Sequence, residues 1–317
     1  MDSISELSLP RVGVGCNAFG RRVDLESVFR IVDAAIDEGA AFFDTADVYG
    51  LGASEEYLGQ AIRGRRDQVI VATKFGMDLE GLNGDDGGRR GSPEYVRTAV
   101  EASLRRLGTD RIDLYQLHAP DRSTPIAETL GALDELVKDG KVRAIGCSNF
   151  RAWEVVDADW TARTAGLTRF VTAQNEYSLY NRSAEEELVP SCLKHDLGIL
   201  PYFPLAYGLL TGKYGRDKPA PAGSRLADES QARRLVNAGW DRIDELQGFA
   251  DDRGISLLQL AIGGLAAQPA VASVIAGVSR PEQVAANASA GAWQPTEDDL
   301  AELAALRPAM RTYATYG

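Results

Sequence analysis

The sequence contains few cysteines and no long apolar run. Its three cysteines, Cys16, Cys147 and Cys192, are an odd number without CxxC spacing, so they predict neither a disulfide framework nor a zinc site, and we expect no metal. No stretch approaches the roughly eighteen uncharged apolar residues of a membrane-spanning helix. The N-terminal stretch MDSISELSLP lacks the basic start and apolar core of a secretion signal. We therefore expect a cytoplasmic protein without a membrane partner.

Basic residues are scarce relative to acidic ones. Lys and Arg number 34 against 46 Asp and Glu, which gives a formal net charge of -12. Such a surface repels a phosphate backbone or an anionic membrane, so we expect no nucleic-acid partner. With 44% hydrophobic and 25% charged residues, the composition is typical of a soluble globular protein with a large core, which excludes the disordered and fibrous classes.

A dinucleotide-binding fingerprint is also missing. Glycines at positions 13, 15 and 20 lie in the stretch RVGVGCNAFG, but the glycine required at the sixth position of the motif is lacking. No convincing βαβ unit with a terminal acidic residue follows. The simpler interpretation is a glycine-rich strand end that exposes backbone near a cavity.

The sequence does contain a repeated succession of helix, glycine and strand. Strands are predicted at 11–16, 41–43, 69–73, 112–117, 142–145, 171–173, 199–202 and 271–275. Helical patterns separate them, at 24–38, 54–62, 92–107, 130–137, 151–164, 184–195 and 257–265. Strict βα alternation leaves an open doubly wound sheet or a closed barrel, and eight units without a fingerprint or a linker favour the barrel.

We therefore predict a (β/α)8 TIM barrel that forms a single domain over residues 1–317. Segments 78–91 and 204–229 interrupt the alternation and are expected as long loops at the C-terminal face, where barrels carry function. Segment 296–306 is expected as an extra C-terminal helix.

Ionisable side chains follow three successive strands. Asp44 ends the second strand, with Tyr49 five residues further on; Lys74 ends the third strand and His118 the fourth. Each alone could cap a turn or belong to the core. Because the active site of a barrel lies at the carboxyl ends of its strands, the four together predict a catalytic site. Asp47, in the turn, is the main rival for a catalytic carboxylate.

These residue types suit proton delivery to a carbonyl group that receives hydride. A tyrosine with an ordinary pKa of about 10 is a poor acid, but an adjacent ammonium stabilises the phenolate and lowers that pKa. Lys74 can supply the ammonium, and Asp44 can keep it charged and oriented. His118 can donate a hydrogen bond to the carbonyl oxygen beside Tyr49.

The same four residues, together with four further motifs, resemble the aldo-keto reductase superfamily over essentially the whole chain. The motifs are GCSNF at 146–150, QNEYSLYNR at 174–182, PLAYGLLTGKY at 204–214 and AGVSRPEQVAAN at 276–287. The resemblance implies a barrel that binds NADP(H) in extended form without a Rossmann domain. It implies Tyr49 as general acid or base, tuned by Lys74 and Asp44, with His118 orienting the substrate carbonyl.

The resemblance also implies a cofactor site. Ser148, Asn149 and Gln174 would hold the nicotinamide carboxamide, and Tyr202 would stack on its ring. The pyrophosphate would be wrapped by Leu205, Gly208, Leu209, Thr211 and Lys213, and the adenosine end would be bound by Gly277, Arg280, Gln283 and Asn287. The Arg280 guanidinium suits a 2′-phosphate and favours NADPH. NAD(H) stays possible, because Ala276 replaces a frequent proline and Gly277 a lysine of some relatives.

The expected substrate is a small aldehyde, ketone or sugar, or the corresponding alcohol. Its pocket would be lined by Phe19, Tyr49, Phe75 and His118, with Tyr313 and Tyr316 from the C-terminal tail. Two alternatives stay open: a lyase that forms a Schiff base through Lys74, and a slowly turning-over regulatory protein of the kind seen in the potassium-channel β subunits. The sequence does not predict an oligomeric state.

Overall fold

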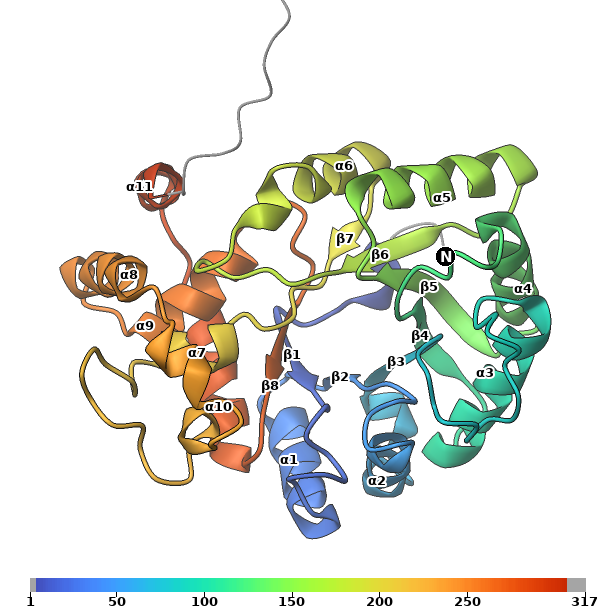
Figure 1. Ribbon diagram of the computed structural model, residues 1–317, viewed down its shortest axis with the longest axis horizontal. Helices are drawn as coiled ribbons and strands as arrows, with labels where there is room; N and C mark the ends of the chain where they lie inside the picture. The colour runs from blue at the N-terminus through green and yellow to red at the C-terminus, as the bar shows by residue number, and fades with distance from the viewer. Residues whose placement is uncertain (1–3, 307–317) are drawn as a thin grey trace, which may run out of the picture.

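Eight parallel strands form the centre of the computed structural model, which describes residues 4–306 (Figure 1). Their order in the sheet is β7-β6-β5-β4-β3-β2-β1-β8. The strands are β1 (Val12–Gly15), β2 (Phe42–Asp44), β3 (Ile70–Phe75), β4 (Ile112–Leu117), β5 (Val142–Ser148), β6 (Phe170–Gln174), β7 (Gly198–Ile199) and β8 (Val274–Gly277). The backbone of Ile199 closes the ring, since its N–H donates to Ala270 O at 2.6 Å and its carbonyl accepts from Ala272 N at 2.9 Å. The predicted (β/α)8 barrel is confirmed.

Helices surround the strands. They are α1 (Leu25–Asp37), α2 (Ala53–Ala61), α3 (Pro93–Leu107), α4 (Ile126–Lys138), α5 (Ala152–Ala165), α6 (Leu188–His195), α7 (Ala232–Val236), α8 (Trp240–Asp252), α9 (Leu257–Gln259), α10 (Pro281–Gly291) and α11 (Glu297–Ala305). Local sequence fixes their ends: Ser92 caps α3 by accepting from Tyr95 N, Pro93 opens it, and Gly108 ends it at φ 62°. The extra C-terminal helix is present as α11.

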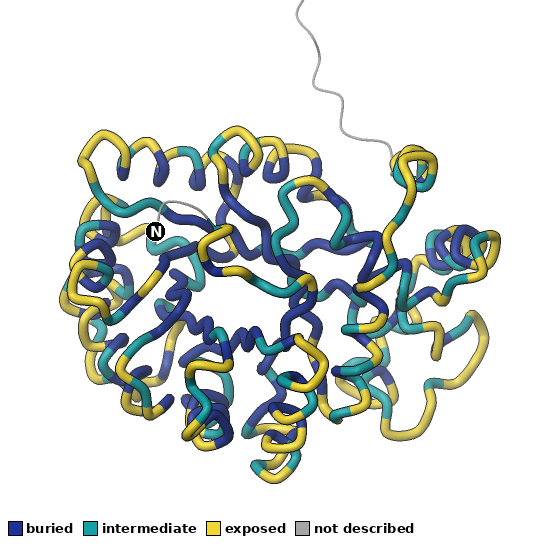
Figure 2. Tube along the Cα trace, turned by 180° about the vertical axis from the view of Figure 1, so that it is seen from behind, coloured by how far each residue is buried: buried dark blue, intermediate teal, exposed yellow. Residues whose placement is uncertain are grey.

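The barrel interior has an apolar layer below a polar one. The apolar layer takes side chains from most of the strands and is completed by Leu7 of the short helix η1 (Ile4–Leu7); its strand and strand-end members are Phe42, Ala72, Leu114, Ala144, Val171, Leu200 and Ile275. Two residues further along their strands, Asp44, Lys74 and Gln116 point into the same interior. Figure 2 shows this buried ring of strands, with most of the exposed surface on the helices and loops outside it.

The structure differs from the sequence-based prediction around the last two strands. Regular pairing of β7 stops at Ile199, and Tyr202 forms only an isolated bridge to Glu176. The eighth strand begins at Val274 instead of residue 271. Helices α7 and α8 were not predicted, although α8 buries a regular stripe that includes Ile243 and Leu246. They are additions between β7 and β8, where the βα alternation requires only one helix.

The long loops hold short helical turns. The segment after β7 contains η4 (Ala206–Thr211) and η5 (Arg225–Ala227), and a π-helical turn, η6 (Leu260–Gly264), continues α9. Further short turns are η2 (Arg66–Gln68) and η3 (Ser183–Glu185). The segment after β3 is held by ion pairs of Arg90 with Asp86 at 2.5 Å and with Asp78 at 2.9 Å.

Candidate active site

The four predicted catalytic residues meet at one end of the barrel. Lys74 Nζ lies 2.6 Å from Asp44 Oδ2 and 5.1 Å from the centre of the Tyr49 ring. The rings of Tyr49 and His118 meet edge to face, with their centres 5.8 Å apart. Asp44 and Lys74 are buried, whereas Tyr49 and His118 are partly exposed. The buried pair therefore lies beneath two side chains that a ligand can reach.

Asp44 is satisfied by three side-chain donors. Lys74 donates to Oδ2, while the amides of Gln116 and Gln174 donate to Oδ1 at 3.2 and 2.9 Å. Lys74 also donates to the backbone carbonyl of Thr45 at 2.8 Å. A buried ion pair is stable only when its remaining hydrogen-bonding capacity is used, and these contacts supply the partners.

The electrostatic effect on Tyr49 is opposite in sign to the expectation. Desolvation by the surrounding protein raises the pKa of the Tyr49 phenol, and the nearby Lys74 ammonium, which lowers it, does not compensate fully. Burial alone would lower the pKa of Lys74, but the charge of Asp44 and its hydrogen bond to the ammonium, together with the nearby Tyr49, outweigh burial and raise it. At neutral pH the site therefore holds a protonated phenol beside an ammonium.

His118 is a neutral imidazole at neutral pH. Burial, reinforced by the Lys74 charge, lowers its pKa to about 3. Its Nδ1 atom has no hydrogen-bond partner within residues 4–306. A neutral imidazole carries one N–H, so His118 can donate one hydrogen bond to a ligand without carrying a charge.

Asp47, the rival carboxylate, is enclosed by the protein. Its side chain is 0% exposed, and neither carboxyl oxygen has a partner in the described part of the chain. Burial and then the charge of Glu55 on α2 raise the pKa of Asp47 well above its ordinary value. A neutral, enclosed carboxyl group does not suit the role of a catalytic carboxylate, so Asp44 holds the position that contacts Lys74.

The residues expected around the nicotinamide lie next to His118 and Asp44. Asn149, at a left-handed φ of 61°, donates to the carbonyl of His118 at 2.9 Å and accepts from the Tyr202 hydroxyl at 2.8 Å. The Ser148 hydroxyl donates to the backbone carbonyl of Gln174 at 2.9 Å. Gln174 is 2% exposed, and its amide nitrogen is engaged by Asp44.

The residues expected around the rest of the cofactor lie in two further loops. Leu205, Gly208, Leu209, Thr211 and Lys213 belong to or flank η4, where Gly208 adopts a φ of 100° that favours glycine. The Thr211 hydroxyl closes this turn by donating to Gly208 O at 2.7 Å. Gly277 ends β8, and the exposed Arg280 directly precedes α10. Within α10, the side-chain oxygen of Gln283 accepts from Ser279 N at 2.7 Å, and Asn287 is buried.

Two residues expected in the substrate wall do not face the barrel mouth. Phe75 is 0% exposed, and its ring stacks on Tyr115 at 4.7 Å. Because Lys74 points into the barrel, its neighbour Phe75 points outward toward the helices. Phe19 is likewise 0% exposed within the hydrophobic core. Neither ring offers a surface to a substrate, so we withdraw both from the wall. Tyr313 and Tyr316 lie outside the described residues.

An arginine cluster near the site was missed. The Arg234 guanidinium lies 3.7 Å from the centre of the Tyr207 ring, and that of Arg225 lies 5.2 Å from the same ring. Burial, followed by the charge of Arg22, lowers the pKa of Arg225. None of Arg22, Arg225 and Arg234 forms a salt bridge within residues 4–306. Arginines without an ion-pair partner in an acidic protein favour binding of an anionic ligand. The two adjacent arginines of the QARRL stretch were the feature of the sequence that could have indicated this cluster.

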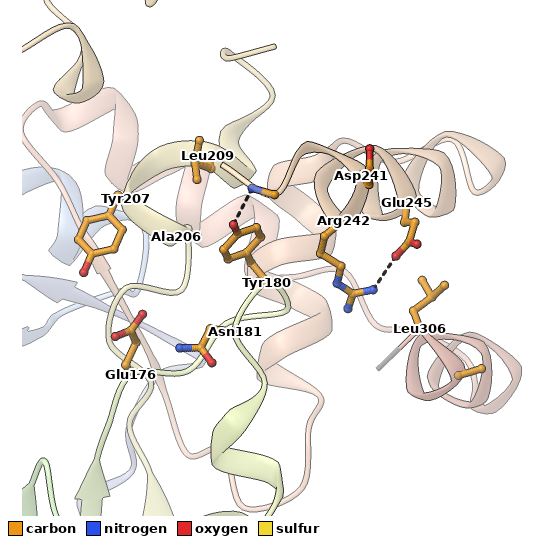
Figure 3. A pocket seen from close by; sticks show the side chains of 12 residues that line it. Glu176, Tyr180, Asn181, Ala206, Tyr207, Leu209, Asp241, Arg242, Glu245 and Leu306 are labelled. Atoms are coloured by element: carbon orange, nitrogen blue, oxygen red, sulfur yellow. Dashed lines mark hydrogen bonds and ion pairs between the residues drawn. The ribbon is translucent and has the colours of Figure 1, made fainter. Parts of the chain in front are cut away.

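A cleft of about 770 Å³ adjoins this cluster (Figure 3). It is lined by Glu176, Tyr180, Tyr207, Arg242, Glu245 and Leu306, among others. The backbone of Glu176 pairs with that of Tyr202, but none of the four predicted catalytic residues lines the cleft. Within residues 4–306 there is no cluster of three or more His, Cys, Asp or Glu side chains arranged to hold a metal. The same residues contain no helix long and apolar enough to cross a membrane.

Comparison with known proteins defines the class. The model of the aldo/keto reductase family matches residues 11–308, and the chain belongs to that family. It is 35% identical over 280 residues to a probable voltage-gated potassium channel subunit beta of Arabidopsis thaliana, covering 86% of this chain and 84% of that protein. It is 34% identical to the probable aldo-keto reductase 1 of Glycine max, covering 92% of this chain and 84% of that one.

A solved structure extends the comparison to the fold. The glycerol dehydrogenase AKR11B4 from Gluconobacter oxydans superposes with a TM-score of 0.78 at 30% sequence identity, covering 97% of this chain and 96% of that chain. The chain is therefore an oxidoreductase of a family that uses nicotinamide cofactors and acts on small carbonyl or alcohol substrates.

Proposed function

We propose that this oxidoreductase transfers hydride between NADP(H) and the carbonyl or alcohol group of a small aldehyde, ketone or sugar, with Tyr49 as the general acid and base. The observation that carries the proposal is the position of Lys74, in contact with Asp44 and beneath the Tyr49 ring. The protonated phenol beside an ammonium suits a group that must give up its proton only when negative charge develops on the substrate oxygen.

Each residue has a distinct part in this chemistry. The Tyr49 hydroxyl donates its proton to the carbonyl oxygen, and the Lys74 ammonium stabilises the phenolate that is left. Asp44 keeps Lys74 charged and oriented. Neutral His118 donates one hydrogen bond to the same oxygen and fixes its position beside Tyr49. The bound nicotinamide supplies or accepts the hydride.

The donors present fit that cofactor. Ser148, Asn149 and Gln174 carry hydroxyl and amide groups at the place expected for a carboxamide, and each of them also donates within the protein, to Gln174 O, His118 O and Asp44 respectively. Tyr202 offers an aromatic face. Arg280 lies exposed at the start of α10 and is assigned to the 2′-phosphate, which favours NADPH over NADH. The unpaired arginine cluster beside Tyr207 supports binding of a cofactor that carries several phosphate charges.

The Schiff-base alternative is disfavoured by the state of Lys74. A lysine nucleophile must be a neutral amine, but Lys74 has a raised pKa, is 0% exposed, and donates to both Asp44 and Thr45 O. The regulatory alternative has one point in its favour, the similarity of this chain to a relative named as a channel subunit, and that similarity does not assign a regulatory role. A complete set of four catalytic residues supports turnover. The three cysteines are free, as in proteins of a reducing compartment, and support the proposed cytoplasmic location.

The test is a panel of aldehydes, ketones and sugars assayed by the absorbance of NADPH. We expect oxidation of NADPH by the wild type and a fall in kcat of about 100- to 10,000-fold in Tyr49→Phe, the range for loss of a general acid. Tyr57→Phe, in α2 and away from the site, is the matched control and should be unaffected. If the wild type oxidises NADPH no faster than a reaction without enzyme on every substrate of the panel, the regulatory alternative is favoured.

A further inference from the structure

Gln116 contacts the carboxylate oxygen of Asp44 that Lys74 does not contact. It lies on β4, two residues before His118, and its side chain is 0% exposed. Its amide nitrogen donates to Asp44 Oδ1 at 3.2 Å, whereas Lys74 donates to Oδ2 at 2.6 Å. The two oxygens of Asp44 thus have separate partners, and Gln116 shares Oδ1 with Gln174.

Packing alone does not explain a glutamine at this position. Its Oε1 atom is buried and has no hydrogen-bond partner within residues 4–306. A buried unsatisfied polar atom costs free energy that an apolar side chain would avoid, and Leu114, one layer below, is such a side chain. The side-chain hydrogen bond that the amide makes is the one to Asp44.

The surrounding barrel makes room for this amide. A side chain at Gly146 on β5 would begin 2.1 Å from the Thr172 hydroxyl and 3.3 Å from Gln116 Cγ. Position 146 therefore has to be glycine if both polar side chains are to stay in the interior. The direction of the amide is fixed as well, because a carboxylate accepts hydrogen bonds and only the amide nitrogen can donate to it.

We infer that Gln116 is a positioning residue for the reaction: by holding Asp44 Oδ1, it keeps Oδ2 directed at Lys74 and keeps the Lys74 ammonium beneath the Tyr49 ring. The inference rests on the proposed function, since it assigns Gln116 an effect on the proton donor Tyr49. Without the bond, Asp44 Oδ1 keeps only the amide of Gln174 as a side-chain donor. The carboxylate is then less stabilised and draws the Lys74 proton more strongly, so Lys74 stabilises the phenolate less well.

The first test uses a readout that does not depend on activity. In protein labelled with ¹⁵N-lysine, Lys74 is identified by loss of its signal in Lys74→Arg, and exchange of its ammonium protons with water is measured by NMR. Gln116→Met keeps the volume and removes the donor, and we expect exchange about tenfold faster, the effect of losing one charge-assisted hydrogen bond. Gln268→Met is the control, because Gln268 is also buried but donates to Gly264 O at 3.0 Å, away from the site.

The kinetic test separates the inference from the proposed function. Gln116→Met should lower kcat by about tenfold, with KM for NADPH unchanged, because it disturbs the proton donor and not the binding of the cofactor. Faster exchange in Gln116→Met together with an inactive wild type would show that Gln116 holds the Asp44–Lys74 pair, but would reject the reductase and with it the effect assigned to Gln116 on Tyr49. Unchanged exchange and unchanged kcat in an active enzyme would overturn the inference and leave the reductase intact.

A second variant covers the case in which Gln116→Met does not fold. In Gln116→Glu, a protonated carboxyl group can donate to Asp44 at low pH and loses that ability when it ionises. Exchange of the Lys74 ammonium, corrected for the pH dependence of the wild type, should then become faster as pH rises. An exchange rate that follows the wild type at every pH contradicts the role assigned to Gln116.

Discussion

Lys74 Nζ lies 2.6 Å from Asp44 Oδ2, and neither side chain is more than 4% exposed. Taking two charges out of water costs several kcal/mol per ion unless each is paired and its other hydrogen bonds are made. Here the amides of Gln116 and Gln174 and the carbonyl of Thr45 provide those bonds. The pair thereby holds a fixed ammonium next to Tyr49, the group that we propose becomes negatively charged.

Breaking this pair from one side should destabilise the protein strongly. Lys74→Met leaves Asp44 as a buried charge without its ion-pair partner, and Asp44→Asn leaves the ammonium in the same state, so each should lower the free energy of unfolding by about 3–5 kcal/mol. The combined variant removes both charges and should lose clearly less than the sum of the two. Urea denaturation at pH 7 measures all three, as a double-mutant cycle.

The control for this cycle is an exposed pair. Arg97 and Glu135 lie 2.7 Å apart but are 50% and 57% exposed, so Arg97→Ala should cost at most about 1 kcal/mol. Additive losses for Lys74→Met and Asp44→Asn would mean that the two side chains do not depend on each other, contrary to the structure.

The pH dependence of kcat/KM should lack an ionisation of His118. Because burial and Lys74 lower the pKa of His118 to about 3, the imidazole is neutral throughout the range from pH 5 to 8 and its donor capacity does not change. His118→Gln should therefore lower kcat/KM without changing the shape of the profile in that range.

The second histidine provides the control for that experiment. His195 lies in α6 and contacts Asp159 at 2.7 Å, and it belongs to none of the elements that carry the four proposed catalytic residues. His195→Gln should change neither kcat/KM nor the shape of its pH profile. A step near pH 6.5 that disappears only in His118→Gln would show that His118 is charged at the lower pH and contradict its assigned state.

The sequence predicted which strands meet better than how their side chains interact. Asp44, Lys74 and His118 could be placed together because the carboxyl ends of parallel strands share one edge of a barrel. The bond between Gln174 and Asp44 spans 130 residues and depends on side-chain direction, which no local pattern encodes. The orientation of Phe75 followed from strand alternation and was available once Lys74 was assigned to the interior.

The sign of the Tyr49 pKa shift was not available from the sequence. A neighbouring ammonium could be inferred from the order of the strands, but the competing desolvation depends on how closely the loops cover the ring. Helix α8 was missed for a different reason. Its apolar stripe is regular, but the βα alternation already had a helix at 257–265, so a second one before β8 had no place in the expected topology.

Asp47→Asn should stabilise the protein, and increasingly so as pH rises. The pKa of the buried Asp47 carboxyl is raised well above its ordinary value of 3.8, so above pH 4 the folded state keeps a proton that the unfolded state has released. Stability then falls as pH rises from about 4 toward the raised pKa. The amide of Asn has the same shape and does not ionise, so Asp47→Asn removes this loss of stability with rising pH. At pH 8 the free energy of unfolding should increase by on the order of 1 kcal/mol or more.

A second buried aspartate supplies the contrast. Asp113 is 1% exposed and accepts from Arg66 at 2.7 Å and from Arg143 at 2.9 Å, so Asp113→Asn should destabilise the protein. Thermal unfolding of both variants from pH 5 to 8 gives the comparison. Loss of stability in Asp47→Asn, growing with pH, would show that Asp47 is ionised and paired in the folded protein.

Arg280 and Arg225 should affect cofactor binding in different ways. Arg280 is exposed at the start of α10 and is assigned to the 2′-phosphate, which only NADPH carries. Arg280→Ala should therefore weaken the binding of NADPH by about tenfold or more, the effect of losing one charge-assisted hydrogen bond. The binding of NADH should stay unchanged. Arg225 lies 5.5 Å from the centre of Phe203, whose ring in turn contacts Tyr202. Arg225 also contacts Tyr207 of η4, the turn proposed to hold the pyrophosphate that both cofactors share, so we expect Arg225→Ala to weaken the binding of both.

Titration of the protein's fluorescence with NADPH and with NADH measures these affinities directly, and kcat/KM for the two cofactors gives an independent estimate. Arg63→Ala is a suitable control, since Arg63 lines a separate cavity between α2 and α3. This variant should bind both cofactors as tightly as the wild type. A clear preference of the wild type for NADH that Arg280→Ala leaves unchanged would reject the assignment of Arg280. It would leave the role of Arg225 standing if that variant still weakens both cofactors, because the pyrophosphate is present in each.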